Sequence, residues 1–258
     1  MPRVPRLLFA AALSALLCAG LMWRSAPAAA LGESSRVEIR GVSVAGLGEP
    51  RVTARRRLAW EVRKRTSIET RLRPRRARLD DPTLFETPLL YFAGAEAFDP
   101  LSEAEVVGLR RFLELGGFLL VDDATGGASE GFDRSVRRLL GRALPRDPLR
   151  PVPSDHTVYR SFYLLDRPVG RVRGPASLEA IARGDRLAVI LSRHDLGGAW
   201  ARDDLGTFTY PVTPGGDIQR ERAIRLGVNL VMYALCLDYK DDQVHAPYLM
   251  RRRGGRPE

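Results

Sequence analysis

Cysteine and histidine are scarce in this sequence, which narrows the chemistry that it can support. Of 258 residues, two are cysteines, Cys18 and Cys236, and three are histidines. Cys18 falls in an N-terminal segment that we expect to be removed, so an intramolecular disulfide is excluded and stability must come from packing. Cys236 lies in an almost wholly apolar run, residues 224–237. We therefore predict a buried thiol without a chemical role.

Several motifs of cofactor binding and catalysis are also missing. The sequence contains no G-x-x-x-x-G-K phosphate loop, no G-x-G-x-x-G dinucleotide fingerprint and no H-E-x-x-H zinc motif. These patterns would place backbone amides on phosphates or two histidines on a metal ion. We therefore expect no cofactor. We also identify no G-x-S-x-G nucleophile elbow and so do not expect serine-hydrolase chemistry.

The basic charge is concentrated at the two ends of the chain. The net charge is +10, and residues 36–78 alone carry 13 Arg and one Lys against four Glu. Residues 251–258 form a second basic segment, whereas residues 79–250 are mildly acidic. No nucleic-acid recognition motif accompanies the arginines, so nucleic acid is not an expected partner. Contact with an anionic membrane surface is compatible with this distribution.

The first 30 residues have the features of a secretory signal peptide. Arg3 and Arg6 precede the apolar run Leu7–Met22, and Ala28–Ala30 forms a small-residue cleavage site. The mature chain would begin near Leu31 and would be periplasmic or secreted. The alternative is an uncleaved membrane anchor, although 16 apolar residues are fewer than the roughly 20 that span a bilayer.

A lipoprotein built on Cys18 is a further alternative for the leader. Leu17, directly before Cys18, is larger than the residue expected at such a processing site. After the leader, the 45% hydrophobic content supports one core. We therefore predict a single α/β domain at 31–250, followed by a basic tail at 251–258.

Strand and helix patterns alternate along the domain. Strands are predicted at 37–47, 67–72, 88–94, 118–122, 177–181 and 187–192, and helices at 53–65, 102–116, around 132–140 and at 219–237. The helix after Ser102 is the best specified, because Ser102 and Glu105 form a capping box and Gly116 ends the pattern. This alternation favours a doubly wound, mainly parallel sheet.

Two adjacent acids end the most apolar strand. Residues 116–127 read G-G-F-L-L-V-D-D-A-T-G-G, which places Asp122 and Asp123 at the carboxyl edge of a parallel sheet, where such folds bind ligands. Successive side chains of a strand point to opposite faces, so only one acid can face a crevice. Asp123 could instead accept hydrogen bonds from the T-G-G turn. Arg134, at the start of the next helix, could pair with the acids or bind an anion.

A second polar group follows the strand at 187–192. His194 and Asp195 stand at its end, Gly197 and Gly198 would let a ligand approach the backbone, and Trp200 would form a wall. The alternative is a tight turn that Asp195 caps.

The remaining two histidines are isolated in the sequence. His156 lies in a loop, where a histidine is either structural or part of a site. For His245, in the charged C-terminal stretch, we expect no role.

Several segments resemble one bacterial family. They read R-L-A-W-E-V-R-K-R-T-S-I at 57–68, P-L-L-Y-F-A-G at 88–94, L-S-E-A-E-V-V-G-L-R-R-F-L-E-L-G-G-F-L-L-V-D-D at 101–123 and G-F-D-R-S at 131–135. Together with the region from S-R-H-D-L-G onward, they are similar to a bacterial domain of unknown function, family 4159. The resemblance implies a flavodoxin-like, class I glutamine amidotransferase-like fold. It implies no activity, because the position of the amidotransferase nucleophilic cysteine holds Asp122 or Asp123 here.

Two functional hypotheses remain at this point. The first is an exported module of the cell envelope that binds a small molecule or a protein partner without catalysis. The second is a metal- or carboxylate-dependent hydrolase, which requires the five acidic and imidazole side chains to converge on one point. Those side chains are Asp122, Asp123, His156, His194 and Asp195.

Overall fold

The computed structural model describes residues 36–253, with side chains described as far as residue 236. The described residues from Val37 onward belong to one compact unit. The expected signal peptide, residues 1–30, lies outside the described residues, as do the side chain of His245 and those of the basic tail. Among the helices described, none is both long enough and apolar enough to cross a membrane.

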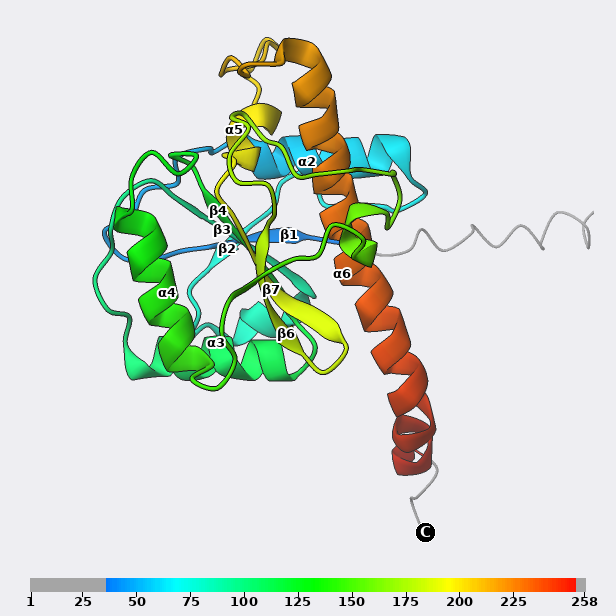
Figure 1. Cartoon of the computed structure of the whole chain (residues 1–258). Helices are drawn as coiled ribbons and strands as arrows, with labels where there is room; N and C mark the ends of the chain where they lie inside the picture. The colour runs from blue at the N-terminus through cyan, green and yellow to red at the C-terminus, as the bar shows by residue number, and fades with distance from the viewer. Residues whose placement is uncertain (1–35, 254–258) are drawn as a thin grey trace, which may run out of the picture. The chain divides into compact units, whose positions relative to one another are not determined.

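A seven-stranded, mostly parallel sheet forms the centre of the domain (Figure 1). Its strands lie in the order β2-β1-β3-β4-β7-β6-β5. The first five in this order run parallel; at one edge β6 pairs antiparallel with β7, and β5 pairs antiparallel with β6. The strands are β1 (Ile39–Val42), β2 (Arg76–Ala77), β3 (Leu89–Gly94), β4 (Phe118–Asp123), β5 (Arg150–Pro151), β6 (Glu179–Arg183) and β7 (Arg186–Ser192).

Helices cover both faces of the sheet, which confirms the α/β class (Figure 1). Side chains of α2, α5 and α6 form one core with the first face, and side chains of α3 and α4 form a second core with the other. The helices are α2 (Ala54–Arg65), α3 (Glu103–Glu114), α4 (Gly131–Ala143), α5 (Leu196–Trp200) and α6 (Gly216–Arg253), with short 3-10 turns η2 (Pro82–Glu86) and η3 (Thr157–Tyr159).

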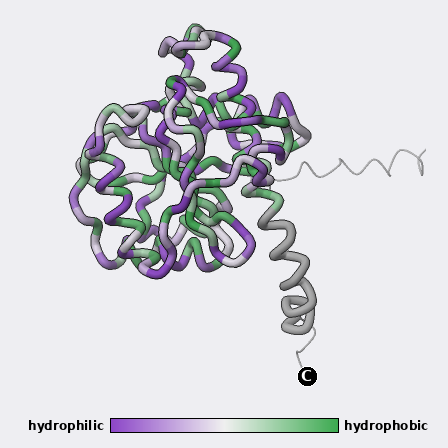
Figure 2. Tube along the Cα trace, in the orientation of Figure 1, coloured by the Kyte–Doolittle hydropathy of each residue, from purple (hydrophilic) through white to green (hydrophobic). Residues whose placement is uncertain are grey.

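The strand sequences assign each side chain to one of the two cores. Tyr91 of β3 and Leu120 of β4 belong to the first core, whereas Phe92 and Val121 belong to the second. Every residue of these two strands is buried, as expected for parallel strands covered on both faces. Figure 2 shows hydrophobic residues concentrated along these central strands. The alternation continues to the strand ends and there sends neighbouring side chains to opposite faces.

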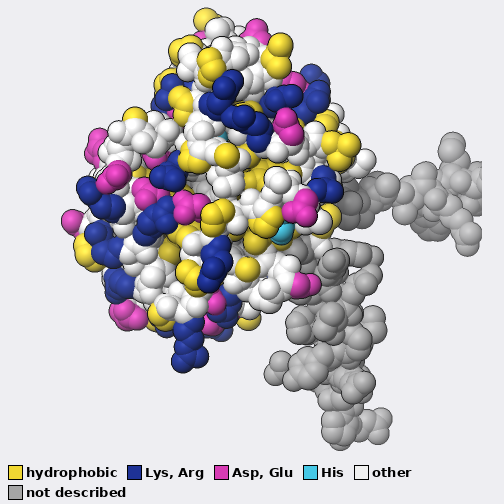
Figure 3. Space-filling model, viewed as in Figure 1, with side chains coloured by type: hydrophobic (Ala, Val, Ile, Leu, Met, Phe, Trp, Pro, Cys, Tyr) yellow, Lys and Arg dark blue, Asp and Glu magenta, His cyan; other side chains and the backbone are white. Residues whose placement is uncertain are grey.

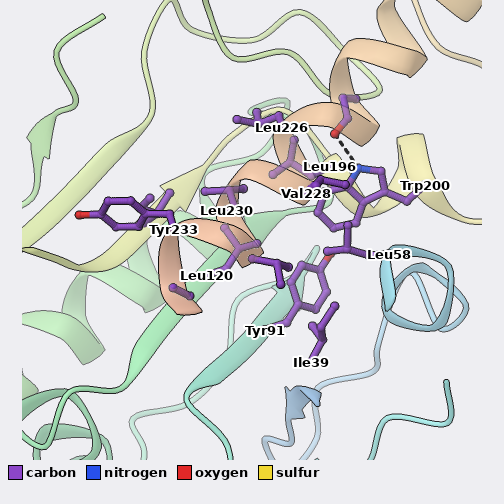
Figure 4. Close-up of a cluster of buried hydrophobic side chains, with 14 of the residues drawn as sticks. Ile39, Leu58, Tyr91, Leu120, Leu196, Trp200, Leu226, Val228, Leu230 and Tyr233 are labelled. Carbon is purple, nitrogen blue, oxygen red and sulfur yellow. Dashed lines mark hydrogen bonds between the residues drawn. The ribbon is translucent and has the colours of Figure 1, made fainter. Parts of the chain in front are cut away.

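The first core is built around α6 (Figure 4). Leu226 and Leu230 of α6 belong to the same cluster of buried side chains as Trp200 of α5, Leu58 of α2 and Leu120 of β4. The indole nitrogen of Trp200 donates to the carbonyl of Ala223 at 2.9 Å. Trp200 is therefore a core residue, and the prediction that it forms the wall of a ligand crevice is wrong.

Most predicted elements are present, and α3 is the clearest case. The Ser102 hydroxyl accepts from the Glu105 amide at 3.3 Å, and the Glu105 carboxylate accepts from the Ser102 amide at 3.1 Å, so the capping box forms. The predicted strand at 67–72 is wrong. Thr70 makes only an isolated bridge to Val37, and the edge strand is β2, after Pro74. The predicted strand at 177–181 lies two residues later, at 179–183, and forms a hairpin with β7.

The final helix is longer than predicted, and the expected burial of Cys236 is wrong. α6 begins at Gly216 and continues to Arg253, beyond the predicted end at 237. Its last fully buried side chains are Tyr233 and Ala234, and Cys236 is exposed. An apolar helical run predicts burial only where a neighbouring element covers it, and the first core ends just before Cys236.

Candidate functional site

The ends of β4 and β7 bring the two predicted polar groups together. Asp122 is paired with Ser192 in the parallel register, so the residues after Ser192 begin beside the carboxyl end of β4. Asp122, Asp123, His194 and Asp195 are all fully buried. A sheet edge that buries three carboxyl groups has to supply each of them with donors or with a proton.

Asp122 holds the start of α5. Its side chain points to the face covered by α2, α5 and α6, where Oδ1 accepts from the amide of Leu196 at 2.9 Å and Oδ2 accepts from that of Gly197 at 2.7 Å. Oδ2 also accepts from the hydroxyl of Tyr91, one strand away, at 2.8 Å. Asp122 thus links two strands to the first turn of a helix.

Asp195 is the N-cap of α5 and the centre of an ion-pair cluster. Its backbone is left-handed, with φ of 52°, a strained conformation for a residue with a side chain. The carboxylate accepts from the Gly198 amide at 2.9 Å and from Arg51 through Nε at 2.9 Å and Nη2 at 2.6 Å. The Nε of Arg171 also donates to Oδ2.

Burial and charge raise the pKa of Asp122 to about 7. Burial is the largest cause, and the nearby negative charge of Asp195 adds to it, against the lowering effect of the donors from Gly197 and Leu196. The same environment raises the pKa of the Tyr91 phenol, first through burial and then through the charge of Asp122. The pKa of Asp122 is therefore raised above that of an exposed aspartate.

Asp123 has a different environment, because it points to the opposite face. Its Oδ1 accepts from the amide and the hydroxyl of Thr125 at 2.8 and 2.6 Å, and its Oδ2 accepts from the amide of Gly127 at 3.1 Å. These bonds close the T-G-G turn in the manner of an Asx turn. The structure supports the capping alternative for Asp123.

His194 is a buried, neutral histidine. Its Nε2 lies 2.9 Å from the carbonyl of Pro175, and its Nδ1 lies 3.3 Å from the hydroxyl of Ser192. Burial lowers its pKa to about 4, and the positive charges of Arg193 and Arg167 contribute, against the raising effect of the Pro175 bond. Its ring holds the 173–175 loop against the end of β7.

Two further predicted residues lie away from this cluster. His156 caps η3, because its Nδ1 accepts from the amide of Val158 at 3.1 Å. Arg134 is 73% exposed and pairs with Glu130 on its own helix at 3.3 Å, so the expected pairing with the strand-end acids is wrong. The structure thus brings Asp122 and Asp195 together at the start of α5, whereas the ring of His194 contacts Pro175 and Ser192 and the other candidates lie apart.

The arginines that do contact the cluster come from loops. Arg51 lies between β1 and α2 and also donates to the carbonyl of Ala124 at 3.0 Å, and its guanidinium lies 4.0 Å from the ring centroid of Tyr210. Arg171 belongs to the irregular stretch before β6. The sequence could have predicted Arg51 as a site residue, because it follows a strand whose carboxyl end lies at this edge. No sequence pattern marks Arg171.

The glycines of α5 make room for the carboxylates rather than for a ligand. A Cβ at Gly198 would lie 2.4 Å from Oδ2 of Asp195, and one at Gly197 would lie 2.5 Å from the Tyr91 hydroxyl. Both glycines therefore allow the helix to start in contact with the buried acids.

Residues 127–131 read G-A-S-E-G and fit the G-x-S-x-G pattern, so the expectation that this motif is missing is wrong. Ser129 is exposed, six residues after the end of β4, and its hydroxyl accepts from the amide of Gly131 at 3.4 Å. It does not have the positive φ of a strained turn. The segment is a loop before α4 and has no nucleophile-elbow geometry.

Every carboxylate of the cluster accepts hydrogen bonds from the protein, which limits the chemistry that these acids can perform. Among the described side chains, no group of three or more His, Cys, Asp or Glu residues is arranged to hold a metal ion. The one described cysteine is Cys236, on the exposed part of α6. The convergence that the hydrolase hypothesis requires is therefore not formed, and the described acids serve as acceptors for backbone amides and arginines.

Comparison with known proteins supports a single assignment. None of the curated proteins matches the sequence. The family model described as Domain of unknown function (DUF4159) matches residues 47–235, which include β3, β4, β7 and both acids of the cluster. Because this match covers most of the chain, the protein belongs to the DUF4159 family of domains of unknown function.

Proposed function

We propose that this domain is a non-catalytic binding module of the cell envelope, which uses an amidotransferase-like fold to bind a small molecule or a partner protein. One observation carries the proposal. Both oxygens of Asp122, Asp123 and Asp195 accept hydrogen bonds from the protein itself, so no acid at the carboxyl edge is free to act as a base or a metal ligand.

The strand order supports the fold assignment in this proposal. The order β2-β1-β3-β4-β7 corresponds to the 2-1-3-4-5 arrangement of flavodoxin-like sheets, with β6 and β5 added at the far edge. At the end of β4, where an amidotransferase has its cysteine, this chain has Asp122 and Asp123. An amidotransferase-like fold with this replacement keeps the location of a site and loses its nucleophile.

The envelope location rests on the leader alone. Arg3 and Arg6, the apolar run and the small-residue site at 28–30 support export of the mature domain. The basic segment at 36–78 supports contact with an anionic surface or partner.

A specific observation favours one alternative. A carboxyl group whose pKa lies near 7, as that of Asp122 does, is typical of general acids and bases. A hydrolase would require Asp122 to exchange its bonds to Leu196 and Gly197 for bonds to a substrate, with α5 moving away.

Turnover assays separate the two proposals. The purified domain is incubated with glutamine and with chromogenic carboxylic and phosphoric esters, with and without Mg²⁺, Mn²⁺ or Zn²⁺, beside the Asp122→Asn variant. The binding-module proposal predicts no difference between wild type and variant. Hydrolysis by the wild type that is lost in Asp122→Asn would overturn it and support the hydrolase.

A further inference from the structure

A cavity of about 350 Å³ lies beside the carboxylate cluster, and none of its lining residues belongs to that cluster. Its walls come from the stretch before β6 and from the first turn of α6, and they include Arg167, Arg173, Ile218, Gln219 and Arg222. This volume falls in the lower part of the range of small-molecule sites, about 300–1,000 Å³. Figure 3 shows basic side chains at the surface around α5 and the start of α6.

The charge of the cavity is unbalanced. Three arginines line it, and the only acid among the lining residues is Asp166, which lies 3.7 Å from Arg222. Arg167 and Arg173 form no hydrogen bond or ion pair with any residue that the structure describes. By contrast, Arg51 and Arg171 are both paired with Asp195. Two arginines of the cavity lining thus have no acceptor among the described residues.

A buried side chain fixes the shape of the cavity. Gln219 is only 5% exposed, and its amide nitrogen donates to the carbonyls of Gly170 and Thr213 at 2.9 and 2.8 Å. Its amide oxygen accepts from the amide of Gly215 at 3.1 Å. These bonds join both walls, so Gln219 positions the arginines without itself being available to a ligand.

We propose that this cavity binds a phosphoryl anion, held by the guanidinium groups of Arg167 and Arg173. Guanidinium forks match phosphate oxygens in two-point hydrogen bonds, and a doubly charged anion would balance the excess charge of the arginines. The first amides of α6 lie at the same wall and have no acceptor within the helix, which adds a favourable dipole. The inference rests on the proposed function and names the ligand class.

The cavity is connected to the carboxylate cluster through one loop. Arg171 lies between the two unpaired arginines in the sequence, and its amide donates to the carbonyl of Asp195 at 3.1 Å. The next amide, that of Val172, donates to the carbonyl of His194 at 3.2 Å. The strained turn at Asp195 therefore holds the anion-binding loop in place, which gives the buried acids a role in binding without chemistry.

The phosphoryl group could belong to a soluble ester or to a lipid headgroup. Ile218, at the rim of the cavity, is 77% exposed, a feature that suits a bilayer surface as well as a partner molecule.

The experiment is a titration of the mature domain with inorganic phosphate, followed by thermal unfolding at constant ionic strength set with chloride. The melting temperature of the wild type should rise with phosphate concentration. The double variant Arg167→Gln/Arg173→Gln should weaken phosphate binding at least about tenfold. The control Arg146→Gln/Arg160→Gln makes the same charge change at two exposed arginines outside the cavity and should keep the response.

A second measurement locates the bound anion and identifies its source. Amide resonances of residues 215–219 should shift with phosphate in NMR spectra. Sedimentation with phosphatidylglycerol vesicles, compared with phosphatidylcholine vesicles, distinguishes a lipid headgroup from a soluble ester: vesicle binding that the double variant loses assigns the site to lipid, and phosphate binding without vesicle binding assigns it to a soluble ester.

The inference would be overturned if neither phosphate nor vesicles bound, or if the double variant and the control responded equally. Such a failure would not change the result of the turnover assays, so it would not decide the proposed function. Release of phosphate from an ester bound in the cavity would have the opposite meaning, because the site would stand and the non-catalytic proposal would fail.

Discussion

At the scale of single residues, the role of each buried acid depends on the hydrogen-bond donors that surround its side chain. Asp122 and Asp123 are adjacent in sequence, yet one receives two helix amides and a phenol, and the other closes a turn. Burial, together with the nearby charge of Asp195, raises the pKa of Asp122 to about 7. The structure thus predicts an effect of pH on stability that can be tested at Asp122.

Stability should fall as pH rises through the titration of Asp122. The folded state binds this proton more tightly than the unfolded chain, whose ordinary pKa is about 3.9. Between about pH 4 and pH 7 the native state therefore holds more protons, and the free energy of unfolding decreases. We expect urea unfolding to show this slope in the wild type and a reduced slope in Asp122→Asn. Parallel pH profiles would contradict the assignment.

Cys236 gives a second test at this scale. Because the first core ends at Ala234, the thiol should react with Ellman's reagent in the native protein at the rate of an exposed cysteine. A Cys18→Ser background makes it the single thiol of the full chain. Reaction only after addition of denaturant would show that the side chain is covered.

At the scale of elements, the sequence predicted best where the local signal and the tertiary packing agree. The capping box at Ser102 fixes the start of α3, and the apolar run of β4 fits a strand buried on both faces. The short edge strand β2 was missed, because two residues carry no periodicity. Arg171 was missed because an irregular loop reaches the site through tertiary contacts that no spacing reveals.

Two helical glycines provide a matched test of this packing. A Cβ at Gly108 of α3 would lie 1.9 Å from the carbonyl oxygen of Leu79, whereas one at Gly141 of α4 would meet nothing within 4 Å. Gly141→Ala should therefore stabilise the fold by about 0.5–1 kcal/mol through helix propensity. Gly108→Ala should destabilise it by about 1–3 kcal/mol through overpacking. Denaturant unfolding measures both, and equal effects would contradict the close contact of α3 with Leu79.

At the scale of the whole molecule, the domain combines buried acids, whose carboxylates are hydrogen-bonded within the protein, with basic surfaces. The family match at 47–235 covers the sheet edge with the acids, and the arginine-lined cavity lies within the same range. Membership of the family fixes no activity, so the functional argument depends on the site and not on the fold. Export is a property of the whole chain, and the geometry of the site gives no information about it.

Export predicts a new N-terminus. In a Gram-negative host, the full-length chain should be recovered from the envelope fraction, and N-terminal sequencing should begin near Leu31. The same chain with Ala28 and Ala30 replaced by Arg should remain uncleaved. Recovery of the intact wild-type chain from the cytosol would contradict the signal peptide.

The central claim is that the acids at the carboxyl edge hold loops in place and do not react. The most direct test is the free energy of unfolding of Asp195→Asn, measured in urea at pH 7. Asparagine tolerates the left-handed backbone, so this change removes mainly the ion pairs with Arg51 and Arg171. The account predicts a loss of about 2–3 kcal/mol, because a buried charge pair is broken on one side. Stability equal to or above that of the wild type would contradict it, since that result is typical of an acid held in place for function.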